Sequence, residues 1–175
     1  PAYAQRFMDR ASAVGVEGLL DTMVLEVTPG RHILASNSRQ GVVEVEAGAV
    51  VFSMGCRERT RGALAIPGTR PAGVFTAGTA QRLVNIEGFM PGRRFVVLGS
   101  GDIGMIMARR LTLEGAHVER VLEIMPYLSG LKRNLVQCLL DFDIPLQLKR
   151  TVSEIKGTNR VEAVVSSAVD EAMQP

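Results

Sequence analysis

A G-x-G-x-x-G pattern at Gly99–Gly104 stands between an apolar run and a helix-forming segment. The apolar run, Arg94–Leu98, predicts a strand buried on both faces. Ile103–Glu114 contains no proline and predicts a helix, which Gly115 ends because glycine tolerates a positive φ. His117–Ile124 predicts a second strand. The sequence therefore predicts an α/β fold with a Rossmann-like strand–turn–helix–strand unit and a parallel sheet.

Each glycine of this pattern has its own role in holding a dinucleotide. Gly99 permits the tight turn, Gly101 lets the backbone approach a pyrophosphate, and Gly104 lets the helix pack closely on the strand. The helix start offers N–H groups and a positive dipole end to phosphates. An ordinary tight turn between a strand and a helix is the alternative interpretation. The candidate cofactor-binding residues of the turn are Gly99, Ser100, Gly101, Asp102, Ile103 and Gly104.

Glu123 is the candidate ligand for a ribose. It stands near the end of the second predicted strand, about 20 residues beyond Gly104, where an acid can accept hydrogen bonds from ribose hydroxyls. A carboxylate there repels a 2′-phosphate, so we expect NAD to be preferred over NADP. The alternative is an acid that is simply solvated at a strand end.

The part of the chain before the glycine pattern predicts a helix and several antiparallel strands. Ala4–Val14 is amphipathic and predicts a helix that Gly15 ends. Arg57–Gly73 is rich in arginine, glycine and proline and predicts a loop or crossover. Thr76–Glu87 predicts a further helix, after which Gly88 and Pro91–Gly92 mark a boundary. Strands are expected at Met23–Val27, His32–Ala35, Val42–Glu46 and Ala49–Ser53.

The part after Glu123 predicts one more helix and three strands. Leu131–Phe142 predicts a regular amphipathic helix, with Leu131 and Cys138 among its inward residues. A short strand is expected at Leu146–Leu148. Val152–Lys156 and Arg160–Val169 predict a hairpin.

Composition excludes several classes of function. The chain has 175 residues and a net charge of +2, and its arginines are not interleaved with aromatic residues, so nucleic-acid binding is not expected. No apolar run approaches the roughly 18 residues of a membrane helix, so no membrane segment is expected. Cys56, Cys138 and the two histidines form no ligand cluster, so no metal site is expected. We expect a cytoplasmic setting.

Four segments carry a resemblance to a known family: Val50–Arg59, Ile66–Thr76, Gly99–Gly104 and Val121–Pro126. Over nearly its whole length the chain resembles the FAD- and NAD-dependent pyridine nucleotide–disulfide oxidoreductase superfamily. Within it, the likeness is to the branch of thioredoxin-reductase-like dehydrogenases and the flavin subunits of amine, opine and cyanide-forming oxidases. The resemblance implies NAD-binding roles for Gly99, Gly101, Gly104 and Glu123, and a place beside FAD for Gly55.

The resemblance also implies a domain organisation and an activity. Residues 1–75 correspond to part of an FAD-binding domain with a β-meander, residues 76–90 to a connecting helix and linker, and residues 91–175 to an NAD-binding Rossmann-like half-domain. In the intact enzyme, hydride passes between NAD(H) and FAD, and the flavin serves a small-molecule substrate or electron acceptor. The family's first glycine motif and its C-terminal FAD segment are not in this sequence. We therefore expect an internal fragment that is inactive alone.

Two departures from the family narrow this expectation. Met105 stands where many relatives carry glutamate, and no redox-active cysteine pair is present, so thioredoxin reductase activity is not supported. A non-catalytic nucleotide-binding or subunit-docking module of the same fold is the alternative, with a homodimer or a partner subunit. A short-chain dehydrogenase fits poorly, because neither Tyr3 nor Tyr127 has a lysine four residues further on.

Overall fold

The computed structural model describes residues 2–172, and the chain forms two compact units, Pro1–Gly55 and Cys56–Pro175. The predicted cofactor domains, with boundaries at residues 75 and 90, follow from the family resemblance and stay a prediction. The packing units divide at a different place, because residues 56–75 pack with the second unit.

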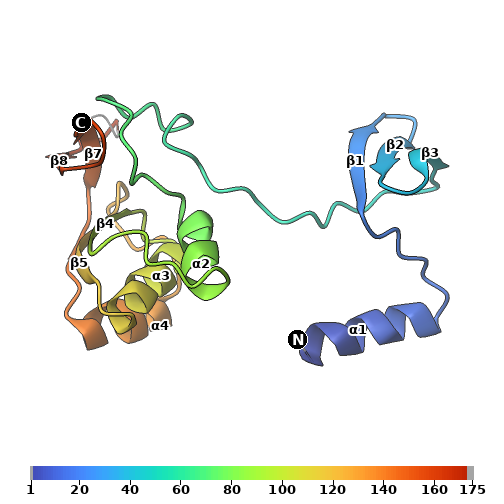
Figure 1. Ribbon diagram of the computed structural model, residues 1–175, viewed down its shortest axis with the longest axis horizontal. Coiled ribbons are helices and arrows are strands. Elements are labelled where there is room, and N and C mark those ends of the chain that lie inside the picture. Colours follow the sequence, from blue (N-terminus) through green and yellow to red (C-terminus); the bar gives the residue numbers. More distant parts are fainter. Residues whose placement is uncertain (1, 173–175) are drawn as a thin grey trace. The chain divides into compact units, whose positions relative to one another are not determined.

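The first unit contains a helix and a three-stranded antiparallel meander (Figure 1). Helix α1 (Ala2–Ala13) ends before Gly15, whose φ of 82° is unfavourable for other residues. Strands β1 (Thr22–Val27), β2 (His32–Asn37) and β3 (Gly41–Glu46) pair in the order β1-β2-β3. The predicted helix and the first three predicted strands of this region are therefore confirmed.

The strand predicted at Ala49–Ser53 is wrong, since this segment has no regular structure. Val51 and Phe52 are 84% and 65% exposed. An apolar run becomes a strand only when its backbone N–H and C=O groups find partners on a neighbouring strand, and no strand among the described residues pairs with this segment. Gly55, just beyond it, has a φ of 70° and lies in open surroundings.

The second unit is built on a parallel sheet in the order β4-β5-β6. Strands β4 (Arg94–Leu98) and β5 (His117–Leu122) pair in parallel along their length, and β6 (Leu146–Gln147) pairs with the end of β5. Helix α3 (Asp102–Leu113) connects β4 to β5, and α2 (Ala77–Asn85) packs against α3. The predicted Rossmann-like unit is confirmed.

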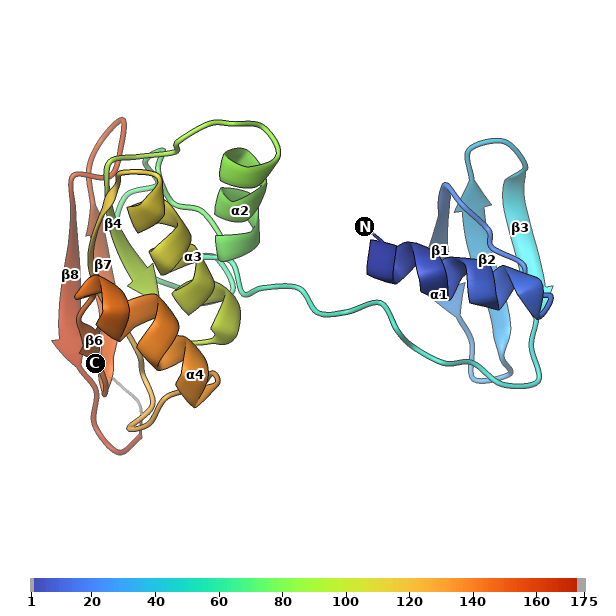
Figure 2. The same cartoon turned by 90° about the horizontal axis from the view of Figure 1, so that it is seen from below.

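The sheet of the second unit is covered on both faces (Figure 2). Helices α2 and α3 and the helical run after β5 cover one face, and the hairpin of β7 (Arg150–Lys156) and β8 (Ala163–Ala168) covers the other. Residues of β4 alternate between the two cores, because successive side chains of a strand point to opposite faces. The helix-side core includes Met105, Ala108, Leu111, Val121 and Leu139, and the hairpin-side core Leu122, Val152 and Ile155.

The helical run after β5 differs from the regular helix predicted at Leu131–Phe142. It consists of α4 (Lys132–Asn134), a π-helical turn η1 (Leu135–Leu139) and a 3₁₀ turn η2 (Leu140–Phe142). The prediction that Leu131 points inward is wrong, because it is the N-cap of α4 and is 50% exposed. Its backbone N–H donates to Asp102, which fixes it at the helix start. Cys138 is buried as predicted.

The segment before α2 lies along the hairpin of the second unit. Gly68 forms a parallel bridge to Ile155, and Ala72 forms one to Arg160. The Ile155 N–H donates to the Pro67 carbonyl at 3.2 Å. The predicted loop at 57–73 is therefore an irregular segment that is pinned to β7 and the turn after it.

Candidate functional site

The glycine turn joins β4 to α3 at the carboxyl end of the parallel sheet. Gly99 has a φ of 103°, and its N–H donates to the Leu122 carbonyl at 2.7 Å, which ties the turn to β5. A Cβ on Gly104 would lie 2.6 Å from the Gly99 carbonyl oxygen. The first turn of α3 therefore packs against the strand end more closely than any side chain allows.

Gly101 faces open space. It is the N-cap of α3 with a φ of −62°, and a Cβ built there meets no atom within 4 Å. The first bond of the helix is from the Met105 N–H to the Gly101 carbonyl at 3.1 Å, so the amides of residues 102–104 have no partner within the helix. Unpaired amides and the positive end of the dipole make this helix start a suitable place for an anion.

Glu123 follows β5 directly and is buried, with 3% exposure. Burial alone raises its pKa, but hydrogen bonds to the carboxylate outweigh this effect and hold the pKa below its ordinary value. The group is therefore ionised at neutral pH. Oε2 accepts from the Ser100 N–H (2.9 Å), the Ser100 hydroxyl (2.6 Å) and the Ser129 hydroxyl (2.8 Å), and Oε1 accepts from the Met125 N–H (2.9 Å).

Asp102 is the first residue of α3, where the helix dipole favours a negative charge. Its Oδ1 accepts from the Leu131 N–H at 2.8 Å and from the Asn134 side-chain amide at 2.7 Å. These two hydrogen bonds, the backbone one first, lower the pKa of Asp102, and the charge of Arg133 adds to the effect. Asp102 thus links the start of α3 to the start of α4.

The structure brings together the predicted residues of the turn and Glu123, and it adds Ser129 and Asn134. Neither addition carried a signal in the sequence: Ser129 is six residues from Glu123, and Asn134 is 32 from Asp102. Ile103 is half exposed on α3, and Met105 is fully buried beneath the turn. That the turn residues, Glu123 and Gly55 bind cofactors stays a prediction.

The remaining chemical candidates lie elsewhere. Cys56 is exposed, with its thiol 3.5 Å from the Arg57 carbonyl, and Cys138 is buried, where burial raises the pKa of its thiol. Among residues 2–172, no group of three His, Cys, Asp or Glu side chains is placed to hold a metal ion.

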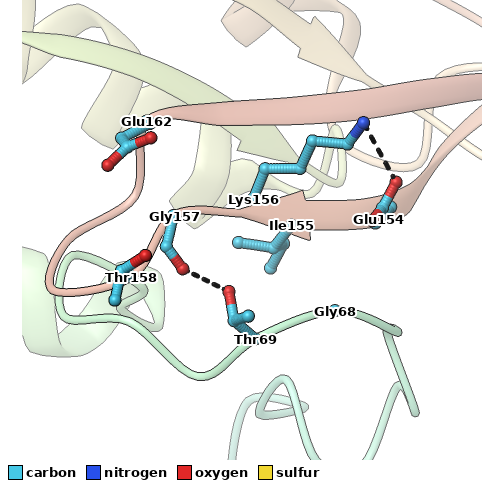
Figure 3. A pocket seen from close by; sticks show the side chains of 8 residues that line it. All are labelled: Gly68, Thr69, Glu154, Ile155, Lys156, Gly157, Thr158 and Glu162. Atoms are coloured by element: carbon cyan, nitrogen blue, oxygen red, sulfur yellow. Dashed lines mark hydrogen bonds and ion pairs between the residues drawn. The ribbon is translucent and has the colours of Figure 1, made fainter.

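A surface hollow of about 450 Å³ lies where Gly68 and Thr69 meet the β7–β8 hairpin (Figure 3). No residue of the glycine turn lines it. The Thr69 hydroxyl donates to the Gly157 carbonyl, and Lys156 pairs with Glu154 at 3.5 Å. Glu154 and Lys156 neutralise each other there, and the described residues that line the hollow include no free helix start or buried charged group, so the glycine turn remains the candidate site.

The fold and the turn define a Rossmann-like α/β protein. The chain belongs to the pyridine nucleotide-disulphide oxidoreductase family, whose sequence pattern matches residues 4–172. This family uses FAD and NAD(P)H. Within the described residues, no helix is long and apolar enough to cross a membrane.

Two curated proteins and a solved structure illustrate the likeness. An opine oxidase subunit from Agrobacterium tumefaciens (strain Ach5) is 28% identical over 138 residues, which are 74% of this chain and 27% of that protein. The CoA-dependent NAD(P)H sulfur oxidoreductase of Pyrococcus abyssi (strain GE5 / Orsay) is 27% identical over 161 residues, or 88% and 35% of the two chains. The chain thus spans about a third of the length of these relatives.

In the solved structures, an FAD-dependent pyridine nucleotide-disulphide oxidoreductase from Desulfovibrio vulgaris superposes with a TM-score of 0.51 at 23% identity. The match covers 86% of this chain and 40% of that one. It supports the flavoprotein reductase fold, and the predicted fold class is confirmed.

Proposed function

We propose that this chain holds NAD(H) in a flavin-dependent oxidoreductase, so that hydride passes between the nicotinamide and FAD. The glycine turn binds the pyrophosphate, and Glu123 binds the adenosine ribose. When bound, the two cofactors supply the redox chemistry, and the residues of this chain bind and orient the nucleotide. A small-molecule substrate or electron acceptor is reduced or oxidised by the flavin, and we assign Gly55 a place beside FAD on the ground of the family resemblance.

The observation that carries this proposal is the open space at Gly101. The position is at the carboxyl end of parallel strands, where ligands of open α/β sheets bind. A Cβ there would meet no protein atom, and three amides of the α3 start lie next in the chain. The backbone can therefore approach a diphosphate without a side chain between them.

The preference for NAD over NADP rests on the charge of Glu123. Its pKa is lowered, so the carboxylate carries a full charge at neutral pH and repels a 2′-phosphate. We expect NADH to bind the chain weakly, and NADPH to bind it more weakly still. Tighter binding of NADPH in calorimetric titrations would contradict the role given to Glu123.

Gly101→Ala tests the proposal without disturbing the fold. The added methyl group enters only open space, so the melting temperature should change little, while NADH affinity should fall at least about tenfold because the methyl blocks the diphosphate. Gly62→Ala is the matched control, since its nearest atom is the Thr60 hydroxyl at 3.8 Å. Equal NADH affinities of Gly101→Ala and the unchanged chain would refute the proposed site.

A second candidate is a nucleotide-binding or subunit-docking module that performs no redox step itself. Two points favour it: one relative is a subunit of an oxidase, and the residue after Gly104 is the buried Met105, where the family resemblance implies an acid. In this case the chain acts with a partner subunit or as a homodimer. A flavin absorbance band in the purified full-length gene product favours the enzyme, and a colourless product favours the module.

A further inference from the structure

Residues 124–131, here called the latch loop, are fastened to the glycine turn. The Ser129 hydroxyl donates a hydrogen bond to Glu123, and the Ser129 N–H donates one to the Ser100 hydroxyl at 3.0 Å. At the end of the loop, the Leu131 N–H donates to Asp102 at 2.8 Å. The loop is therefore tied to both polar side chains of the turn.

Close packing joins the latch loop to the start of α3 as well. A Cβ on Gly130 would lie 2.6 Å from the Met105 methyl group, 2.7 Å from the Asp102 carboxylate and 2.9 Å from the Asp102 backbone nitrogen. The loop backbone thus lies directly against the first turn of the helix. Only a residue without a side chain fits at this place.

The carboxylate of Glu123 has little acceptor capacity left. Each carboxylate oxygen offers about two lone pairs, yet Oε2 already accepts three hydrogen bonds, from Ser100 N–H, Ser100 Oγ and Ser129 Oγ. Oε1 accepts one, from the Met125 N–H. A ribose presents two neighbouring hydroxyls, and only one acceptor position remains for them.

We propose that the latch loop closes the nucleotide-free site: the Ser129 hydroxyl stands in for a ribose hydroxyl on Glu123, and NAD(H) must displace it to bind. This inference rests on the proposed function, in which Glu123 receives the ribose. Ser129 is the part of the network that can leave, because its residue is exposed and its hydroxyl is carried by a loop. The Ser100 N–H belongs to the turn and stays.

The latch lowers the apparent affinity for the nucleotide. If only a fraction of molecules is open, the measured Kd is the intrinsic Kd divided by that fraction. Removing the Ser129 hydroxyl breaks a hydrogen bond to a charged group and raises the open fraction. We expect Ser129→Ala to bind NADH roughly tenfold more tightly than the unchanged chain.

The experiment is a calorimetric titration of NADH into the unchanged chain, Ser129→Ala and the control Ser167→Ala. Ser167 donates to the Ser153 hydroxyl at 2.8 Å in the β7–β8 hairpin, so the control removes a similar hydroxyl away from the turn. Tighter binding by Ser129→Ala alone supports the latch. Equal or weaker binding overturns it and leaves the proposed function standing, whereas no binding by any of the three proteins overturns both.

Hydrogen exchange gives a second test that needs no nucleotide. The amides of Ser129 and Leu131 are protected in the closed loop by Ser100 and Asp102. In Ser129→Ala, the amides of residues 124–131 should exchange faster than in the unchanged chain, and the exchange rates of the β7–β8 hairpin should stay the same. Identical exchange of the loop in Ser129→Ala and the unchanged chain would show that the hydroxyl does not hold the loop, and the latch would be wrong.

Discussion

Both units of the chain contain strands rich in apolar residues, but these residues are buried to very different extents in the two units. In the second unit, the parallel sheet has a core on each face, and Val121, Leu122 and Leu139 are fully buried. In the first unit, only Ala35 is buried among the described residues, and strand residues such as Leu25 are more than half exposed. The meander is held by its strand pairing, whereas the second unit is held by pairing and apolar burial together.

The difference in packing decides which unit can hold a functional site. A site needs side chains fixed by their surroundings, and the turn has this in the buried Ser100 and Glu123. The first unit offers hydrogen-bonded strands without a packed interior. We therefore expect the second unit to be the more stable of the two.

Truncating one leucine in each unit should give the greatest difference in stability. Leu122 has no exposed surface, and Leu122→Ala leaves a cavity in the hairpin-side core, so it should destabilise the second unit by about 2–5 kcal/mol. Leu25→Ala, at a residue 56% exposed in β1, should change the stability of the first unit by no more than about 0.5 kcal/mol.

Denaturant titration with hydrogen exchange read separately for each unit gives both values. Similar losses of stability in the two variants would show that the two units are packed alike. A large loss confined to Leu122→Ala would confirm the difference in packing.

A smaller loss of stability is expected when a methyl group is added at Gly104, where the backbone of α3 contacts the end of β4. In Gly104→Ala, the new Cβ would lie 2.6 Å from the Gly99 carbonyl oxygen, which is backbone and cannot rotate away. We expect a loss of about 1–3 kcal/mol, as for other overpacked positions. Gly18→Ala in the first unit meets no atom within 4 Å and serves as the control.

Thermal melting of the two glycine variants provides the measurement. If Gly104→Ala melts at the temperature of the unchanged chain, then the helix can shift away from the strand, and the close contact is not a constraint.

The sequence predicted the local elements well where one physical pattern decides them. The glycine spacing, the apolar run before it and Gly115 together specify the strand, turn and helix, because each part needs only its neighbours in the chain. The helix predicted at Thr76–Glu87 also forms, and the structure adds a cap that was not predicted, in which the Thr76 hydroxyl accepts from the Thr79 N–H at 3.3 Å. The prediction of a strand at Ala49–Ser53 was wrong, because strand pairing depends on a partner strand that a local pattern does not reveal.

The site was predictable in its backbone and much less in its side chains. The spacing identified Glu123 and the turn, since these follow the geometry of the fold. It did not identify Ser129 or Asn134, because their contacts depend on how the loop after β5 returns to the turn. The π-helical turn at Leu135–Leu139 was missed for a similar reason: apolar periodicity does not register a single extra residue in a helix.

The smallest expected effect concerns the charge on Glu123 and depends on pH. Its folded-state pKa lies below the ordinary 4.5, so the carboxylate stabilises the fold above that pH, and this stabilisation is lost as the pH falls through the folded pKa. Glu123→Gln lacks the charge, so the difference in unfolding free energy between this variant and the unchanged chain should become smaller as the pH falls from 7. Urea titrations of both proteins at pH 7 and at several acidic values measure this difference. Because Ser100 and Ser129 donate to Glu123, acidification should speed hydrogen exchange in the second unit and leave the exchange rates of the meander unchanged. A difference in unfolding free energy that stays constant with pH would mean that the buried carboxylate does not contribute to the difference in stability between the two units.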